Sequence, residues 1–222
     1  MRRSQTRRQA LRPFVRCVLP APRQRRRKFH IGPIGAVGAQ TLRYDANRMT
    51  LAIPVLETPR LVLRGHTPAD LDDAVALWSD PEVVRRIAGK PLSREEVWAR
   101  LLRYIGHWAL AGYGLWQIRE RATGRFVGEA GIADFQRDIA FSFGGAPEAA
   151  WVLGAAARGQ GYATEAMAAV MAWSATMHPR TVCIINPDNE PSLRVAARIG
   201  FRQIARVDYK TGQVVVFERL AT

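Results

Sequence analysis

The chain has 222 residues, of which 48% are hydrophobic and 23% are charged. This composition is ordinary for a globular protein and excludes collagen-like, coiled-coil and wholly disordered chains. No stretch is long and apolar enough to predict a membrane span, and the two cysteines, Cys17 and Cys183, are too few for a disulfide scaffold, so a reducing, cytoplasmic setting is expected.

The formal net charge of +14 is concentrated in the first 48 residues. They hold twelve Arg and one Lys against a single acid, Asp45, whereas residues 49–222 hold 20 basic and 18 acidic residues. Prolines break this segment and its apolar pieces never become periodic, so 1–48 is expected to be a disordered tail. Three interpretations stay open: an electrostatic arm for RNA or acidic surfaces, a targeting segment, or an extension upstream of a true start at Met49. The folded domain is predicted to span 49–222.

The domain begins with a strand and two helices. Residues 60–64 alternate polar and apolar, as a half-buried strand does. The segment 67–70 predicts a helix start, with Thr67 as the N-cap and a proline in the first helical position. The segment 93–96 is a capping box and opens a helix whose apolar residues recur at helical spacing. These residues are Val97, Leu101, Ile105 and Trp108.

The rest of the domain is predicted as three strands, a helix, a strand, a helix and a hairpin. Strands are predicted over 115–119, 126–135, 149–153 and 181–185, and helices over 164–177 and 191–199. Gly200 stands where a left-handed cap would end the last helix. Residues 201–207 and 214–217 are expected to close the chain as a hairpin. The order predicts one α/β domain with a mixed sheet and no internal repeat.

The segment 151–166 (WVLGAAARGQGYATEA) predicts a strand that runs through a glycine-bearing turn into a helix. The first N–H groups of a helix lack internal partners and carry partial positive charge, so small residues there can expose a cradle for a phosphate or diphosphate. Arg158 adds a cation. The segment is neither a P-loop nor a dinucleotide fingerprint, because the required lysine and third glycine are missing. A plain turn whose glycines serve only the backbone is the alternative.

The turn resembles a known family. Residues 158–163 (RGQGYA) are similar to the Gln/Arg-x-x-Gly-x-Gly/Ala signature of the GNAT N-acetyltransferase superfamily. Residues 58–64 and 79–83 resemble the Rim-type ribosomal-protein N-terminal acetyltransferases, as do 186–192 and 196–201. The resemblance covers about 58–220. It implies a mostly antiparallel, twisted sheet flanked by helices, with splayed strands around an acyl-CoA site.

The resemblance also implies roles for individual residues. Acetyl-CoA would be held by main-chain amides of the turn and by the preceding strand, which would pair with the pantetheine arm. The residues for this role are Val152, Leu153, Arg158, Gly159, Gly161, Tyr162, Ala163, Thr164 and Asn189. Ser192 resembles the serine that gives a proton to the departing thiolate, and Asn189 resembles the asparagine that hydrogen-bonds the pantetheine or the thioester region, so both are catalytic candidates. A helix N-cap is the alternative role for Asn189, because Asn-x-Pro-Ser is also a good helix start.

Three further residues are candidates on the acceptor side. Glu129, in a strand otherwise short of charge, would serve as a general base through water, and an outward-facing strand residue is its alternative. Glu148 is a second acid near the acceptor. Tyr113 would line the acceptor cleft, with ordinary packing as the rival role. No metal site is predicted, because the four histidines have no ligand partners at suitable spacing.

Together these observations predict an N-acetyltransferase that moves acetyl from acetyl-CoA to a primary amine by direct attack in a ternary complex. The acceptor would be a protein N-terminus, such as that of a ribosomal protein, or a small-molecule amine. The expected assembly is a monomer or homodimer with no membrane partner. Two alternatives remain: an acyl-CoA-binding protein without catalysis, and an RNA- or ribosome-associated module that works through the Arg-rich tail.

Overall fold

The computed structural model describes residues 52–85, 87, 89–210 and 212–221. The basic tail and Met49 lie outside these residues, so the three interpretations of the tail stay predictions. None of the helices in the described ranges is long and apolar enough to cross a membrane.

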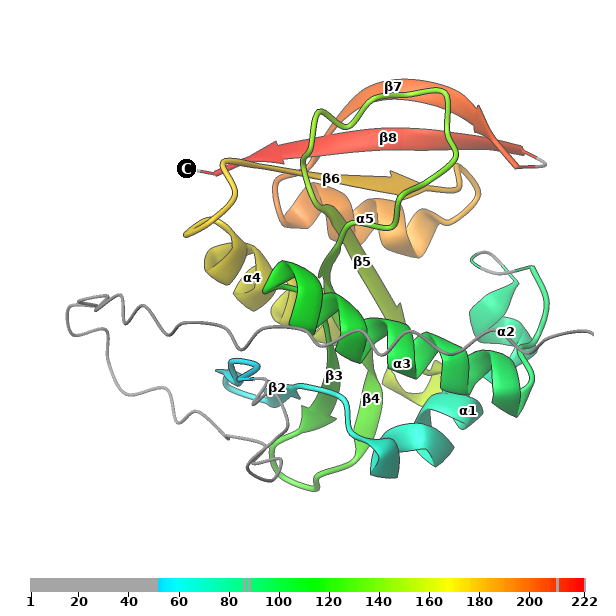
Figure 1. The fold of residues 1–222 in the computed structure, drawn as a ribbon, viewed down its shortest axis with the longest axis vertical. Helices are drawn as coiled ribbons and strands as arrows, with labels where there is room; N and C mark the ends of the chain where they lie inside the picture. The colour runs from blue at the N-terminus through cyan, green and yellow to red at the C-terminus, as the bar shows by residue number, and fades with distance from the viewer. Residues whose placement is uncertain (1–51, 86, 88, 211, 222) are drawn as a thin grey trace, which may run out of the picture. The chain divides into compact units, whose positions relative to one another are not determined.

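The described residues form an eight-stranded sheet in the order β1-β2-β3-β4-β5-β6-β8-β7 (Figure 1). All neighbours are antiparallel except β5 and β6. The strands are β1 (Leu56–Glu57), β2 (Leu61–Arg64), β3 (Leu115–Glu120), β4 (Phe126–Ala133), β5 (Glu148–Leu153), β6 (Arg180–Ile185), β7 (Arg202–Tyr209) and β8 (Gly212–Leu220). The mixed, mostly antiparallel α/β sheet predicted from the sequence is confirmed.

Helices cover both faces of the sheet. They are α1 (Leu71–Ser79), α2 (Pro81–Val84), α3 (Arg94–Ala111), α4 (Tyr162–Ser174) and α5 (Glu190–Arg198), with the 3₁₀ turns η1 (Pro68–Asp70) and η2 (Ala155–Ala157). Helix α4 packs with Ala149 of β5, whereas α1 and α2 pack with Val152. Residues three apart in a strand point to opposite faces, so α4 and α1–α2 lie on opposite sides of β5.

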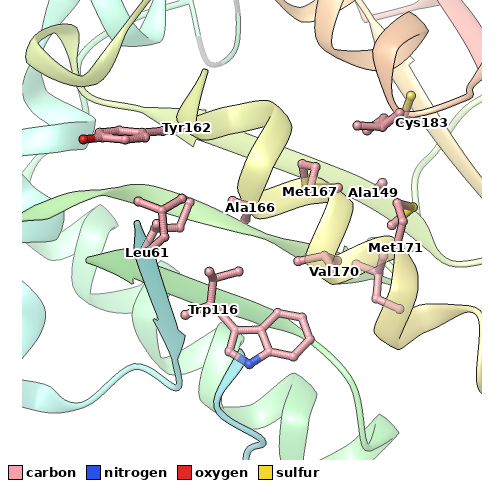
Figure 2. Packing of buried hydrophobic residues seen from close by; sticks show 14 of the residues in the cluster. Leu61, Trp116, Ala149, Tyr162, Ala166, Met167, Val170, Met171 and Cys183 are labelled. Carbon is pink, nitrogen blue, oxygen red and sulfur yellow. The ribbon is translucent and has the colours of Figure 1, made fainter. Parts of the chain in front are cut away.

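The larger core lies between α4 and the central strands. Ala166, Met167 and Val170 are completely buried against Leu61 and Trp116 (Figure 2). Each fully buried side chain of the larger apolar types contributes about 1.5–3 kcal/mol to stability. This packing fixes the start of α4 against the sheet, and the glycine turn immediately precedes it.

Several predicted boundaries need correction. The helix expected at Thr67 begins with a 3₁₀ turn, in which the Asp70 carboxylate accepts hydrogen bonds from the Thr67 amide (2.7 Å) and hydroxyl (2.8 Å). Helix α2 was not predicted; at four residues it is too short for a periodic pattern, and the Asp80 side chain caps it. Helix α4 spans 162–174 rather than 164–177. In α3 the residues Val97, Leu101 and Trp108 are buried as expected, but Tyr104 is buried in place of Ile105, which is half-buried.

Candidate functional site

Strands β5 and β6 diverge (Figure 1). β5 pairs with β4 at six positions but with β6 at one, Glu148 with Val182. Beyond that point, the edge of β5 that faces β6 carries backbone groups that no strand of the described residues takes up. An extended ligand with amides of its own could pair with this edge, as an added strand does.

A cavity of about 410 Å³ lies beside β5, and Trp151, Val152 and Leu153 of that strand line it. It is bounded by β5, the glycine turn with the start of α4, one side of α5 along its length, and the α2 region. Ten residues predicted as cofactor-binding or catalytic line it: Val152, Leu153, Arg158, Gly159, Gly161, Tyr162, Ala163, Thr164, Asn189 and Ser192. The fold therefore gathers residues that are up to 40 positions apart in the sequence.

The glycine turn is shaped to expose helix donors. Gly159 and Gly161 both have left-handed backbones, with φ of 75° and 78°, which glycine adopts without strain. Gly161 precedes α4 and has no side chain to cap it, and the first helical bond runs from the Glu165 amide to its carbonyl (3.0 Å). The three preceding amides, 162–164, have no partner within the helix. A Cβ built on Gly159 meets no protein atom within 4 Å, so the cradle is open.

Arg158 bridges the mouth of the cavity. Its Nη2 atom donates a hydrogen bond to the main-chain carbonyl of Glu82 in α2, at 2.9 Å. Arg158 and Glu82 both line the cavity, so the guanidinium lies in its wall between the glycine turn and α2. The combination of a cation and free helix donors suits an anionic ligand such as a diphosphate.

Asn189 and Ser192 meet at the start of α5. The Asn189 side-chain oxygen accepts a hydrogen bond from the Ser192 amide at 3.4 Å, so Asn189 caps the helix. Both residues line the cavity. The N-cap role and a position beside a ligand are therefore compatible.

Sequence reasoning missed two cations of the cavity wall, Arg194 and Arg198 of α5. A signal was present, because they follow Pro191 by three and seven residues and so lie on the same helical face. Val83 and Ile87 were also missed. They belong to a short helix and the turn after it, which have no periodic pattern.

Glu129 is neither outward-facing nor in the cavity wall. Its side chain is 1% exposed, and its Oε2 atom accepts a hydrogen bond from the Trp78 indole at 3.1 Å. The Oε1 atom lies 3.6 Å from Nε2 of His66, which is equally buried. His66 also packs on the ring of Tyr104, and burial together with the Glu129 charge raises the pKa of Tyr104. Sequence spacing could not place His66 here.

Glu148 and Tyr113 occupy other places. The Glu148 carboxylate accepts two hydrogen bonds from the Arg137 guanidinium, one of them at 2.6 Å, and burial raises its pKa against the effect of Arg137. Arg137 also contacts the Tyr209 hydroxyl, which ties the 134–147 loop to β7. The Tyr113 ring packs edge-on to His107 and His178. The structure does not bring these two residues together with the cavity lining.

The described residues contain no group of three or more His, Cys, Asp or Glu side chains arranged to hold a metal ion. Cys183 is buried, and burial raises the pKa of its thiol well above the ordinary value. The polar groups that the cavity lining offers include backbone donors, the Ser192 hydroxyl, the Asn189 amide, arginines and Glu82.

Comparisons with known proteins show which family the chain resembles in sequence and in structure. The acetyltransferase (GNAT) domain family matches residues 60–202. A GNAT-family acetyltransferase structure from Bordetella pertussis is 32% identical, with a TM-score of 0.66, and the match covers 75% of this chain and 99% of that one. The uncharacterised protein YkkB of Bacillus subtilis (strain 168) is 28% identical over 74% of this chain and 94% of its own length.

A more distant structure shares the fold. It is the ribosomal L7/L12 alpha-N-protein acetyltransferase RimL in complex with coenzyme A, which is 17% identical with a TM-score of 0.62 over 75% of this chain and 97% of that one. The splayed strands, the glycine turn and the family match agree with one another. The chain therefore belongs to the GNAT acetyltransferase family.

Proposed function

We propose that the protein transfers the acetyl group of acetyl-CoA to a primary amine by direct attack in a ternary complex. One observation carries the proposal: the open amides of the 159–164 turn and the free edge of β5 face a single cavity. A ligand that joins a diphosphate to an amide-bearing arm matches both features at once. Acetyl-CoA has this form and supplies an activated acetyl group.

The turn and β5 would bind different parts of acetyl-CoA. The main-chain amides of Gly159, Gly161, Tyr162 and Ala163, with Arg158 and Thr164, would hold the diphosphate. The main chain of Val152 and Leu153 would pair with the pantetheine arm. Only the backbone of Tyr162 is free for this role, since its hydroxyl donates to Glu120 (2.9 Å).

Two residues of α5 are placed for the chemistry. Ser192 would supply a proton to the departing thiolate, and Asn189 would orient the thioester region. The N-terminus of α5 favours negative charge and would also stabilise the thiolate. An α-amine has a pKa of about 8 and is partly neutral at physiological pH, so positioning contributes more than a strong base does.

The acceptor we favour is a protein N-terminus of the Rim type, with a small-molecule amine as the competing class. The motifs in 58–83 and 186–201 support this choice, and a structure of the same fold is named for alpha-N acetylation of a ribosomal protein. The near-neutral domain argues weakly against a strongly acidic acceptor. A cytoplasmic location and a monomeric or dimeric state stay predictions.

A thiol-release assay tests the function. Wild-type protein and acetyl-CoA are combined with a panel of N-terminal peptides and small amines, and Ser192→Ala is compared with Ser79→Ala, an exposed serine outside the cavity. We expect turnover by wild type, and kcat lowered about 100-fold or more for Ser192→Ala with coenzyme A affinity within about threefold, as for loss of a general acid.

Other outcomes contradict parts of the proposal. Full activity of Ser192→Ala would remove the serine from the mechanism. Binding of coenzyme A without turnover on any amine would favour a non-catalytic acyl-CoA-binding protein.

A further inference from the structure

The opening motif, Thr58-Pro59-Arg60, meets the glycine turn through Glu165 of α4. The Thr58 hydroxyl and the Arg60 amide both donate hydrogen bonds to Oε1 of Glu165, at 2.6 and 2.9 Å. The Arg60 Nε and Nη2 atoms both lie 2.6 Å from Oε2. One carboxylate thus receives donors from two residues more than 100 positions away.

Arg60 also contacts the turn itself. Its Nη1 atom donates to the Gln160 carbonyl at 2.9 Å, and its guanidinium lies 4.7 Å from the centre of the Tyr162 ring. Its Nη2 atom lies 3.5 Å from the point where a Cβ on Gly161 would stand. One side chain therefore contacts the residues on both sides of Gly161, and its hydrogen bond holds the Gln160 carbonyl.

The charge of Glu165 makes this contact important for an anionic ligand. Glu165 lies in the first turn of α4, close to the amides that would hold a diphosphate. Burial acts to raise its pKa, but hydrogen bonds from Thr58 and Arg60 outweigh burial and lower it, so the group is ionised at neutral pH. An unpaired carboxylate at this place would repel phosphate oxygens through a partly buried path.

We propose that Arg60, Glu165 and Thr58 form a clamp that positions the diphosphate site. The clamp holds the Gln160 carbonyl toward Arg60, so that amides rather than a carbonyl face the ligand, and it cancels the Glu165 charge. None of the three residues lines the cavity, so all of them act through the turn. The inference rests on the proposed binding of coenzyme A and assigns a positioning role to the opening motif.

Calorimetry with coenzyme A tests the clamp in wild type, Arg60→Gln, Glu165→Gln and the double variant. Arg60→Gln should weaken binding about tenfold, because the turn loses a charge-assisted hydrogen bond and Glu165 is left unpaired. The loss should be larger at low salt. The double variant should bind more tightly than Arg60→Gln alone, because the repelling carboxylate is gone. A residue that only stabilised the fold would not show this rescue.

A second measurement needs no ligand. Amide hydrogen exchange at 159–165 should be about tenfold faster in Arg60→Gln than in wild type, because the turn opens more readily. Arg94→Gln is the matched control, since Arg94 pairs with Asp72 at 2.7 Å on the exposed surface of α3 and α1. It should change neither exchange at the turn nor affinity. Arg60→Lys keeps the charge but lacks the several N–H donors of the guanidinium. Its amide hydrogen exchange at 159–165 is measured instead if Arg60→Gln does not fold.

Two results would overturn the clamp: unchanged exchange and affinity in Arg60→Gln, or a double variant that binds no better than Arg60→Gln. Wild-type protein that takes up no coenzyme A would instead overturn the proposed function. In that case the exchange measurement still decides whether Arg60 holds the turn.

Discussion

Glu129 shows how burial changes the role of a single residue. Its carboxylate is enclosed by Trp78 and His66, and its Oε1 atom and both ring nitrogens of His66 have no hydrogen-bond partner among the described residues. The surrounding core shields these atoms from bulk solvent. A general base, by contrast, must reach the proton that it removes. The enclosed position favours a structural role.

We therefore expect Glu129→Gln to keep kcat within about threefold of wild type, because loss of a true general base costs about 100-fold or more. The amide keeps an acceptor for Trp78 and offers a donor to His66, so the variant should also stay folded. Glu129→Ala should lower the free energy of unfolding by about 2–4 kcal/mol, since the Trp78 N–H loses its partner and a cavity opens. Steady-state kinetics and urea unfolding measure both effects. A hundredfold loss of kcat in Glu129→Gln, with unchanged stability, would make Glu129 the base.

At the scale of elements, the sequence predicted the helix ends that depend only on neighbouring residues. The capping box at Ser93 forms, with the Glu96 carboxylate accepting from the Ser93 amide at 2.7 Å, and Gly200 has the left-handed backbone expected at a helix end. Contacts between residues far apart in the sequence could not be predicted from it. The pairing of His66 with Glu129 spans 63 positions, and the clamp joins Arg60 to Glu165. The spacing of apolar residues along the sequence does not predict such pairs, because they depend on how strands and helices pack in the folded chain.

The glycine turn gives an element-scale prediction with a matched control. Gly159 and Gly124 have nearly the same left-handed φ, 75° and 72°, and a Cβ on either meets no protein atom within 4 Å. Gly159→Ala and Gly124→Ala should therefore each lower the free energy of unfolding by about 1 kcal/mol. Only Gly159→Ala should weaken coenzyme A binding, because its methyl group enters the cradle. Thermal unfolding and calorimetry separate the two effects, and equal affinities would contradict the placement of the diphosphate.

For the molecule as a whole, Asp70 is the point where three elements are joined. Its carboxylate is almost completely buried and accepts hydrogen bonds from Arg64 of β2 (2.8 and 3.0 Å) and Arg119 of β3 (3.0 Å). It also accepts from Thr67, which leads into α1. The Nη2 atom of Arg119 also donates a hydrogen bond to Oδ2 of Asp73 in α1, at 2.6 Å. These bonds hold α1 on the sheet and so keep the α2 wall of the cavity in place.

The same carboxylate should control acid stability. Burial acts to raise the pKa of Asp70, but the side chains of Arg64 and Gln117 and the bonds from Thr67 outweigh it and hold the pKa well below its ordinary range. A carboxyl whose pKa is lowered by folding stabilises the protein above its unfolded pKa of about 3.9, and this contribution is lost as pH falls toward the folded pKa.

Asp70→Asn should therefore be about 3 kcal/mol less stable at pH 7, as expected when one partner of a buried ion pair is removed. It should also lose less stability than wild type between about pH 5 and pH 2, because the titrating group is absent. Urea unfolding across this range measures both effects, with the exposed Asp72→Asn as the control. Parallel stability curves for wild type and Asp70→Asn would mean that other carboxylates govern acid unfolding. A flatter curve would identify the contact between β2, β3 and α1 as the part of the fold that acid weakens.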